Sequence, residues 1–167
     1  RGAALLAPYD DDKGNTGLLA MDASEIEAIT TKALEAGFQV GVHAIGDRAN
    51  RAALNGFERA RAAVPGAIDP RLRIEHAQVL ALEDIPRFAK LGVIASMQPT
   101  HATSDMPWAE ARIGKTRAKG AYAWRTLKKA GAKLSFGSDF PVEGVPPLWG
   151  IHAAVTRTDK KGSPKGG

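Results

Sequence analysis

The chain has 167 residues, of which 44% are hydrophobic and 25% charged, and 23 Lys and Arg against 18 Asp and Glu give a net charge of +5. This balance argues against long disorder, no apolar run reaches the ~18 residues of a membrane span, and the lack of cysteine excludes disulfides and thiolate metal sites. Any metal ion must therefore be held by His, Asp or Glu.

The basic residues do not form a nucleic-acid-binding pattern. Part of the positive charge lies in a Gly-rich basic tail over 158–167, which we expect to be flexible. The remaining Lys and Arg residues are dispersed without aromatic residues interleaved among them, which favours a solvated surface. We therefore expect neither a nucleic-acid partner nor a membrane partner.

Helix and strand patterns alternate along the chain. The expected elements are a loop over 1–20, a helix over 22–37, a strand over 38–43, a helix over 47–64, a strand over 72–76, a helix over 83–91, a strand over 93–98, a long connection over 99–117, a helix over 118–130, a strand over 133–139 and a helix over 148–155. Asp22 and Glu25 form a capping-box pattern, and Asp47 is the expected N-cap of the second helix.

Strands that alternate with helices predict an α/β fold with parallel strand pairing. No strand is followed by the Gly-x-Gly-x-x-Gly of a dinucleotide fold, so a TIM-type (β/α)8 barrel is the favoured alternative. Such a barrel needs at least ~200 residues, whereas this chain supplies about half of the strands. We therefore expect a partial barrel and a longer intact protein.

Three polar residues stand at the carboxyl ends of predicted strands, where a β/α barrel carries its active site: His43, His76 and Asp139. Imidazole and carboxylate suit Zn²⁺, and an Asp beside a metal can act as a general base. The alternative is a hydrogen-bonded pocket histidine and a turn aspartate. An inward-facing His76 would also place Arg73 and Glu75 toward the helices, which requires a bulge or a local ion pair.

Four sequence segments, three of which contain these residues, closely resemble the family 3 branch of the amidohydrolase superfamily, which includes N-substituted formamide deformylases. They are VGVHAIGDRAN, RIEHAQ, GVIASMQPTHATSDMPWAEARIG and LSFGSDFPVEGVPPLWGIHAAVTR. The resemblance runs over residues 1–157. It implies that this segment is strands five to eight of a metal-dependent catalytic barrel, with 158–167 as the tail.

The resemblance also implies the site. His43, His76 and Asp139 correspond to metal-site residues, and Asp139 and His76 take catalytic roles, with Asp139 as the proton shuttle. The cofactor is a divalent metal, Zn²⁺, as one or two ions. The implied reaction is hydrolysis of a non-peptide C–N bond, of the amide type, in a small-molecule substrate by metal-activated water.

Three features of the family are absent from this sequence. They are a His-x-His pair on the first strand and a lysine that ends the fourth strand just upstream of residue 1, which both supply ligands in the family, and the terminal β-rich domain. We therefore expect this chain to be a fragment that is inactive or nearly so, whereas the full-length protein is an enzyme. The alternative is a non-catalytic, structural β/α fragment without a complete metal site.

The connection over 99–117 follows the third strand at the same end of the barrel. Its candidates for substrate contact are His101, Asp105, Trp108 and Arg112, with His101 the best of them, because a long connection in a compact domain is functional or disordered. Trp108 is expected to pack the loop down. The sequence further suggests a cytoplasmic location, since no secretory leader is visible, and leaves a homodimer open.

Overall fold

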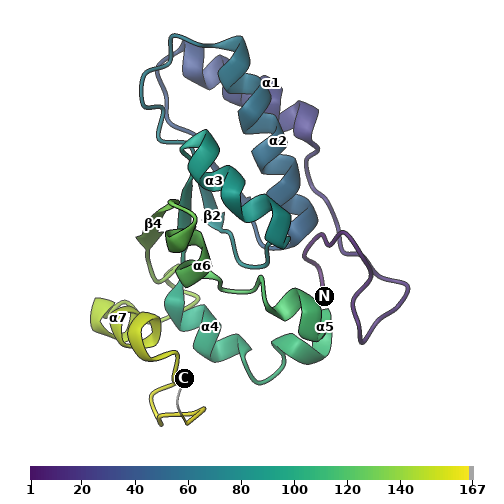
Figure 1. Ribbon diagram of the computed structural model, residues 1–167, viewed down its shortest axis with the longest axis vertical. Helices are drawn as coiled ribbons and strands as arrows, with labels where there is room; N and C mark the ends of the chain where they lie inside the picture. The colour runs from purple at the N-terminus through teal and green to yellow at the C-terminus, as the bar shows by residue number, and fades with distance from the viewer. Residues whose placement is uncertain (166–167) are drawn as a thin grey trace.

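The structure is a computed structural model that describes residues 1–165 (Figure 1). Its elements are α1 (Ala23–Glu35), β1 (Gly41–Ala44), α2 (Asp47–Ala63), β2 (Arg73–His76), the short 3-10 helix η1 (Leu82–Asp84), α3 (Ile85–Leu91), β3 (Ile94–Met97), α4 (Pro99–Asp105), α5 (Ala109–Ala118), α6 (Trp124–Lys129), β4 (Lys133–Phe136) and α7 (Pro147–Thr156). No helix in this described range is long and apolar enough to cross a bilayer.

The four strands form one parallel sheet in the order β1-β2-β3-β4, which confirms the predicted alternation and pairing. Ile74 of β2 lies between Val42 of β1 and Ala95 of β3 in this register. Because all four strands run the same way, their carboxyl ends meet at one edge of the sheet.

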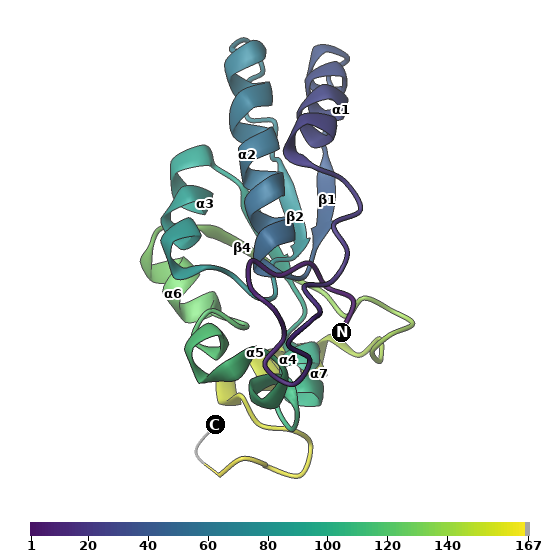
Figure 2. The same ribbon diagram turned by 90° about the vertical axis from the view of Figure 1, so that its right-hand side faces the viewer.

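Helices α2, α3 and α6 cover one face of the sheet, and α1 lies beside α2 (Figures 1 and 2). The core between these layers is apolar and has no exposed surface at Ile74, Phe57, Phe88 and Leu127. Full burial of one such side chain contributes about 1.5–3 kcal/mol, so this layer holds the strand ends in place.

The other face of the sheet is polar. Arg73 and Glu75 form an ion pair on it, and Arg73 also donates a hydrogen bond to the Ser96 hydroxyl at 2.9 Å. Both charged residues share this face with His43, whereas Ile74 points to the helices, so Arg73 and Glu75 do not face the helix layer. His76 departs from the alternation instead, because its φ of 75° turns its backbone out of the extended conformation.

The prediction of a long irregular connection over 99–117 is wrong, because α4 and α5 occupy most of this segment. The predicted helix over 118–130 is also shorter than expected, since α6 begins at Trp124. The break lies at Tyr122, whose φ of 49° is incompatible with a continuous helix. Just before it, Gly120 passes so close to Leu80 that a Cβ atom would lie 1.9 Å from the Leu80 carbonyl oxygen.

Asp47 is not the N-cap of α2. Gly46 caps the helix, and Asp47 is its first residue. The Asp47 carboxylate accepts a hydrogen bond from the Leu6 amide at 2.8 Å, so it ties the N-terminal segment to α2. The capping box of Asp22 and Glu25 on α1 is present as predicted.

The segments near the two ends of the chain are held by hydrogen bonds from backbone amides. The loop over 1–20 packs along α5, where the Asp10 amide donates to the Arg112 carbonyl at 2.8 Å (Figure 1). In the predicted tail, Asp159 accepts hydrogen bonds from the amides of Lys161 and Ser163. The last two residues of that tail, 166–167, lie outside the described residues, and its flexibility stays a prediction.

Candidate metal centre

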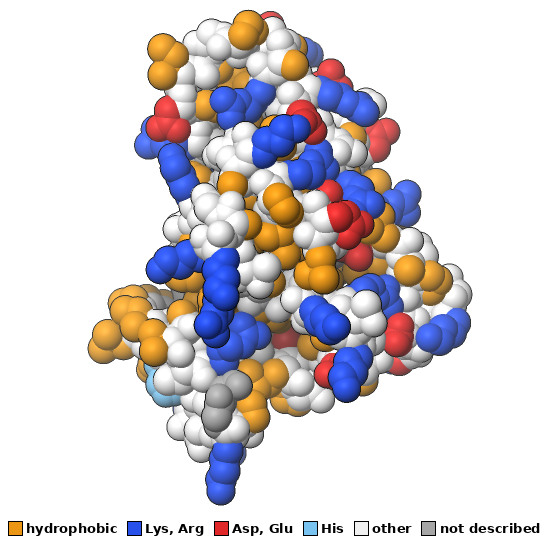
Figure 3. Space-filling model, in the orientation of Figure 1, with side chains coloured by type: hydrophobic (Ala, Val, Ile, Leu, Met, Phe, Trp, Pro, Cys, Tyr) orange, Lys and Arg blue, Asp and Glu red, His pale blue; other side chains and the backbone are white. Residues whose placement is uncertain are grey.

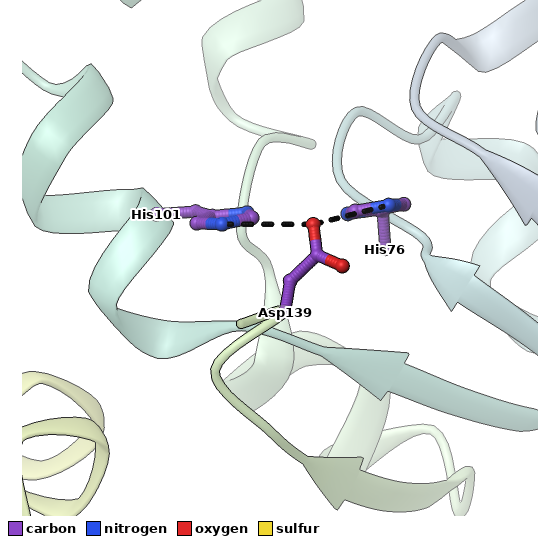
Figure 4. Close-up of side chains that lie close together, drawn as sticks. All are labelled: His76, His101 and Asp139. Atoms are coloured by element: carbon purple, nitrogen blue, oxygen red, sulfur yellow. Dashed lines mark ion pairs between the residues drawn. The ribbon is translucent and has the colours of Figure 1, made fainter. Parts of the chain in front are cut away.

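Three side chains meet at the carboxyl edge of the sheet: His76 at the end of β2, His101 on α4, and Asp139 shortly after β4 (Figure 4). Asp139 Oδ2 lies 4.0 Å from His76 Nε2 and 4.0 Å from His101 Nε2. The two imidazole rings are nearly parallel, with centroids 5.8 Å apart. The carboxylate therefore lies between two imidazoles; we call His76, His101 and Asp139 the ligand cluster.

Backbone conformation directs two of these side chains. His76 and Asp139 both have positive φ values, 75° and 54°, in a region that non-glycine residues rarely adopt. His76 is the last residue of β2, and Asp139 follows the end of β4. The turn at Asp139 is closed by a hydrogen bond from the Val142 amide to the Asp139 carbonyl at 2.8 Å. Such strained residues concentrate at functional sites, and here both belong to the ligand cluster.

The third side chain is placed by a helix start. Gln98 is the N-cap of α4 and Pro99 is its first residue. Proline is favoured at this position because the amide hydrogen that it lacks would have no hydrogen-bond partner within the helix. The helix therefore begins directly after β3, and His101 lies in its first turn at the carboxyl edge of the sheet. His101 is 8% exposed, which places it in the interior rather than on a mobile loop.

The imidazoles are buried without the hydrogen bonds that buried polar atoms usually make. His76 Nδ1 and His101 Nε2 are inaccessible to solvent and have no hydrogen-bond partner within residues 1–165. Burial lowers the pKa of the His76 imidazole, and the nearby His43 ring lowers this pKa further, whereas Asp139 opposes the shift. His76 is therefore held as the neutral imidazole, the form that coordinates metals.

The donor chemistry of the ligand cluster suits a divalent cation. The three potential ligand atoms lie within 4.8 Å of one another, and Asp139 Oδ2 is 4.0 Å from the Nε2 atom of each imidazole. Ligands held ~2.1 Å from a tetrahedral ion lie about 3.4 Å apart, so the cluster would have to close by up to about 1.4 Å around a bound ion. Neutral imidazole and carboxylate are also the donors that Zn²⁺ accepts.

The remaining predicted site residues take different positions. The His43 ring lies edge-on to the His76 ring, with centroids 4.4 Å apart, beside the ligand cluster. The Arg112 guanidinium, on α5, lies 4.2 Å from the centre of the ring of Trp108, the N-cap residue of that helix, so the structure does not bring Arg112 to the cluster. Pro99, two residues before His101, is a signal in the sequence for the helix start that positions His101. The convergence of His101 with His76 and Asp139 was not predicted.

Comparisons with known proteins identify the family to which this fold and cluster belong. Residues 1–165 match the amidohydrolase family, so the chain belongs to that family. It superposes on an uncharacterized metal-dependent hydrolase from Pyrococcus horikoshii OT3 with a TM-score of 0.84 and 38% identity, over 99% of this chain and 32% of that one. The predicted α/β class and partial TIM-type barrel are therefore confirmed.

Two curated relatives extend the comparison. The chain is 41% identical over 157 residues to the putative amidohydrolase YtcJ of Bacillus subtilis strain 168, which covers 94% of this chain and 29% of that protein. It is 26% identical over 160 residues to the N-substituted formamide deformylase of Arthrobacter pascens, which covers 93% of this chain and 29% of that protein. The chain thus spans less than a third of the length of these relatives.

Proposed function

We propose that the chain carries part of the metal centre of a hydrolase that cleaves non-peptide C–N bonds of the amide type in small molecules. The observation that supports this most is the ligand cluster, in which two buried imidazoles and one carboxylate converge at the carboxyl edge of a parallel sheet. His76, Asp139 and His43 are the proposed metal-site residues, and His101 lies close enough to contribute a ligand or to contact substrate.

A divalent cation, proposed to be Zn²⁺, would polarise the substrate carbonyl and lower the pKa of a water molecule when bound. Asp139 is the proton acceptor of the proposal, because its side chain is 40% exposed while its Oδ2 faces both imidazoles. It would take a proton from the attacking water and return it to the leaving nitrogen. The buried His76 would stay neutral and keep a nitrogen lone pair available.

The names of two similar proteins support the proposed specificity for amides. The Arthrobacter relative is named as an N-substituted formamide deformylase, and the Bacillus relative as a putative amidohydrolase. A small-molecule amide therefore remains the proposed substrate class. Arg112 remains a proposed substrate contact, although it packs on Trp108 in the structure.

The test combines metal content with turnover on N-formyl and N-acyl amines. We expect Asp139→Asn to keep most of the bound Zn²⁺ and to lose ~10²–10⁴ of the rate, because Asn cannot take up the proton. His76→Ala should lower both metal content and rate. His152→Ala is the matched control, since His152 is exposed on α7 and lies outside the ligand cluster.

Both this chain and any longer product of its gene should be assayed. We expect the 167-residue chain alone to be nearly inactive, whereas a longer product hydrolyses amides. A longer product with near wild-type rate after Asp139→Asn would contradict the proton-shuttle role. A longer product that neither binds metal nor turns over amides would favour the rival proposal, a non-catalytic structural fragment. Bound metal without amide turnover would contradict the amide substrate class.

A further inference from the structure

A second polar cluster lies at the far end of α4 from Pro99. Asp105 is the last residue of this helix, and its Oδ2 accepts hydrogen bonds from Gln78 Nε2 at 2.9 Å and from the Tyr122 hydroxyl. One carboxylate oxygen therefore joins α4 to the segment that follows β2 and to the turn that precedes α6. We call Asp105, Gln78 and Tyr122 the Asp105 cluster.

The two donors are themselves held by the backbone. The Tyr122 amide donates to the Gln78 carbonyl at 2.7 Å, and the Leu80 amide donates to the Gly120 carbonyl at 3.0 Å. Arg157 donates from its guanidinium to the Tyr122 carbonyl at 2.9 Å. Tyr122 is only 6% exposed, so its hydroxyl is fixed where the carboxylate meets it.

The Asp105 cluster connects the segments that carry two members of the ligand cluster. Gln78 is two residues beyond His76, in the turn whose backbone is left-handed at His76 and Ala77. Asp105 is four residues beyond His101 on the same helix, so both lie on one side of α4. The hydrogen bond from Gln78 to Asp105 thus spans from the His76 turn to the His101 helix.

We propose that Asp105 is a positioning residue for the candidate metal centre, which sets the separation of His76 and His101 by binding Gln78 and Tyr122 through a single oxygen. The inference rests on the proposed function only in treating these imidazoles as ligands. Hydrogen bonds to a carboxylate are about twice as strong as neutral ones, so the tie is a firm one. Loss of residues that orient metal ligands typically lowers metal affinity by about 10–100-fold.

The first experiment needs no metal. The chain has four histidines, so the imidazole signals of the metal-free protein can be assigned by NMR with single His→Gln variants. We expect Asp105→Ala to shift or broaden the His76 and His101 signals and to leave the His152 signal in place. Unchanged His76 and His101 signals would overturn the proposal.

Three further variants separate positioning from loss of charge or of the fold. Asp105→Asn keeps an oxygen acceptor and should stay closer to wild type than Asp105→Ala; an equal effect of both would overturn positioning in favour of charge. Glu110→Ala removes an exposed carboxylate from α5 and should leave all four signals unchanged. Where Asp105→Ala does not fold, Tyr122→Phe decides, because it removes one donor and leaves the carboxylate in place.

The second experiment follows Co²⁺ binding through its visible absorption. We expect Asp105→Ala to weaken Co²⁺ binding by about 10–100-fold and to change the absorption bands, whereas Glu110→Ala does neither. A wild-type chain that binds no Co²⁺ but shows the predicted NMR response would support the positioning role and would show that this part of the metal centre does not bind the ion by itself. Normal Co²⁺ affinity and bands in Asp105→Ala would overturn the positioning role alone.

Discussion

Three titratable neighbours affect the pKa of His76, namely His43, His101 and Asp139. Burial lowers its pKa, and repulsion from the protonated forms of the other imidazoles acts in the same direction. The side chain is 7% exposed, so water screens these interactions poorly. Protonation of His76 is therefore unfavourable in the folded chain.

This environment predicts a pH dependence of stability. The unfolded imidazole titrates near its ordinary value of ~6.5, whereas the folded one has a lower pKa. As the pH falls below about 6.5 the unfolded chain takes up a proton that the folded chain resists, so the free energy of unfolding decreases. We expect wild type to lose stability relative to His76→Gln between about pH 7 and pH 5.5, measured by urea unfolding in chelator.

The comparison is controlled by the other histidines, which both proteins retain. His152→Gln, in α7, controls for the loss of one imidazole as such. Two stability curves with the same slope below about pH 6.5 would contradict the prediction, because the differential proton uptake would then be missing.

The sequence was sufficient to predict the site residues that lie at strand ends, but not those whose place depends on contacts distant along the chain. His76 and Asp139 follow strands, and strand ends of a parallel sheet converge by geometry, so their meeting could be predicted. The role of Asp105 depends on Gln78 and Tyr122, which are 27 and 17 residues away along the chain. No local pattern carries such a contact.

Helix α1 shows how local chemistry defines an element. The Asp22 carboxylate accepts from the amides of Ser24 and Glu25 at 2.8 and 3.0 Å, and the Glu25 carboxylate accepts from the Asp22 amide at 2.8 Å. Three amides that the helix itself cannot satisfy are thereby bonded. The pattern is contained within four residues, which is why the sequence was sufficient to predict it.

Removal of this cap should have a measurable effect on stability. We expect Asp22→Ala to lower the free energy of unfolding by about 1 kcal/mol, in the range of ~0.5–2 kcal/mol found for lost caps. Glu35→Ala at the exposed end of the same helix is the control and should change stability by less than about 0.5 kcal/mol. Equal effects of the two variants in urea unfolding would contradict a role for the cap.

The helices that the sequence missed are short and interrupted. Helix α4 has seven residues, and α5 contains Gly114 with a φ of 76°, which breaks its helical backbone. An apolar repeat needs about three turns to be recognisable, and neither helix supplies an uninterrupted one. The four strands were predicted because each precedes a clear helix or a Gly-containing turn, although each is shorter than expected.

At the scale of the whole molecule, the sheet has two outer strands, β1 and β4. The apolar surface beside them is extensive. A cavity of about 740 Å³ lies between β1, α1 and the N-terminal loop, and it is lined by Leu18, Met21, Ile29, Val40 and Val42 among others. Near β4, Figure 3 shows hydrophobic side chains gathered over α7, where Leu148, Ile151 and Val155 are more than half exposed.

Exposed strand edges and apolar patches drive association in water, because each leaves hydrogen-bonding groups or apolar area that another chain can cover. We therefore expect the 167-residue chain to self-associate, in line with the homodimer that the sequence left open. The apparent mass in sedimentation equilibrium should rise with protein concentration. The α7 surface is expected to contribute, since three of its large side chains are exposed together.

The α7 contribution can be isolated with two substitutions. Ile151→Lys with Val155→Lys places charges on the exposed face of α7, 58% and 78% exposed at these residues, and should shift the chain toward monomer. Ile68→Lys is the matched control, because Ile68 is 94% exposed but lies in the loop between α2 and β2. If the control dissociates the chain as fully as the α7 variant, general charge rather than this surface governs association. If neither variant changes the mass distribution, association proceeds through the sheet edges, and a charge introduced at Leu18, which is 78% exposed and lines the cavity beside β1, becomes the decisive substitution.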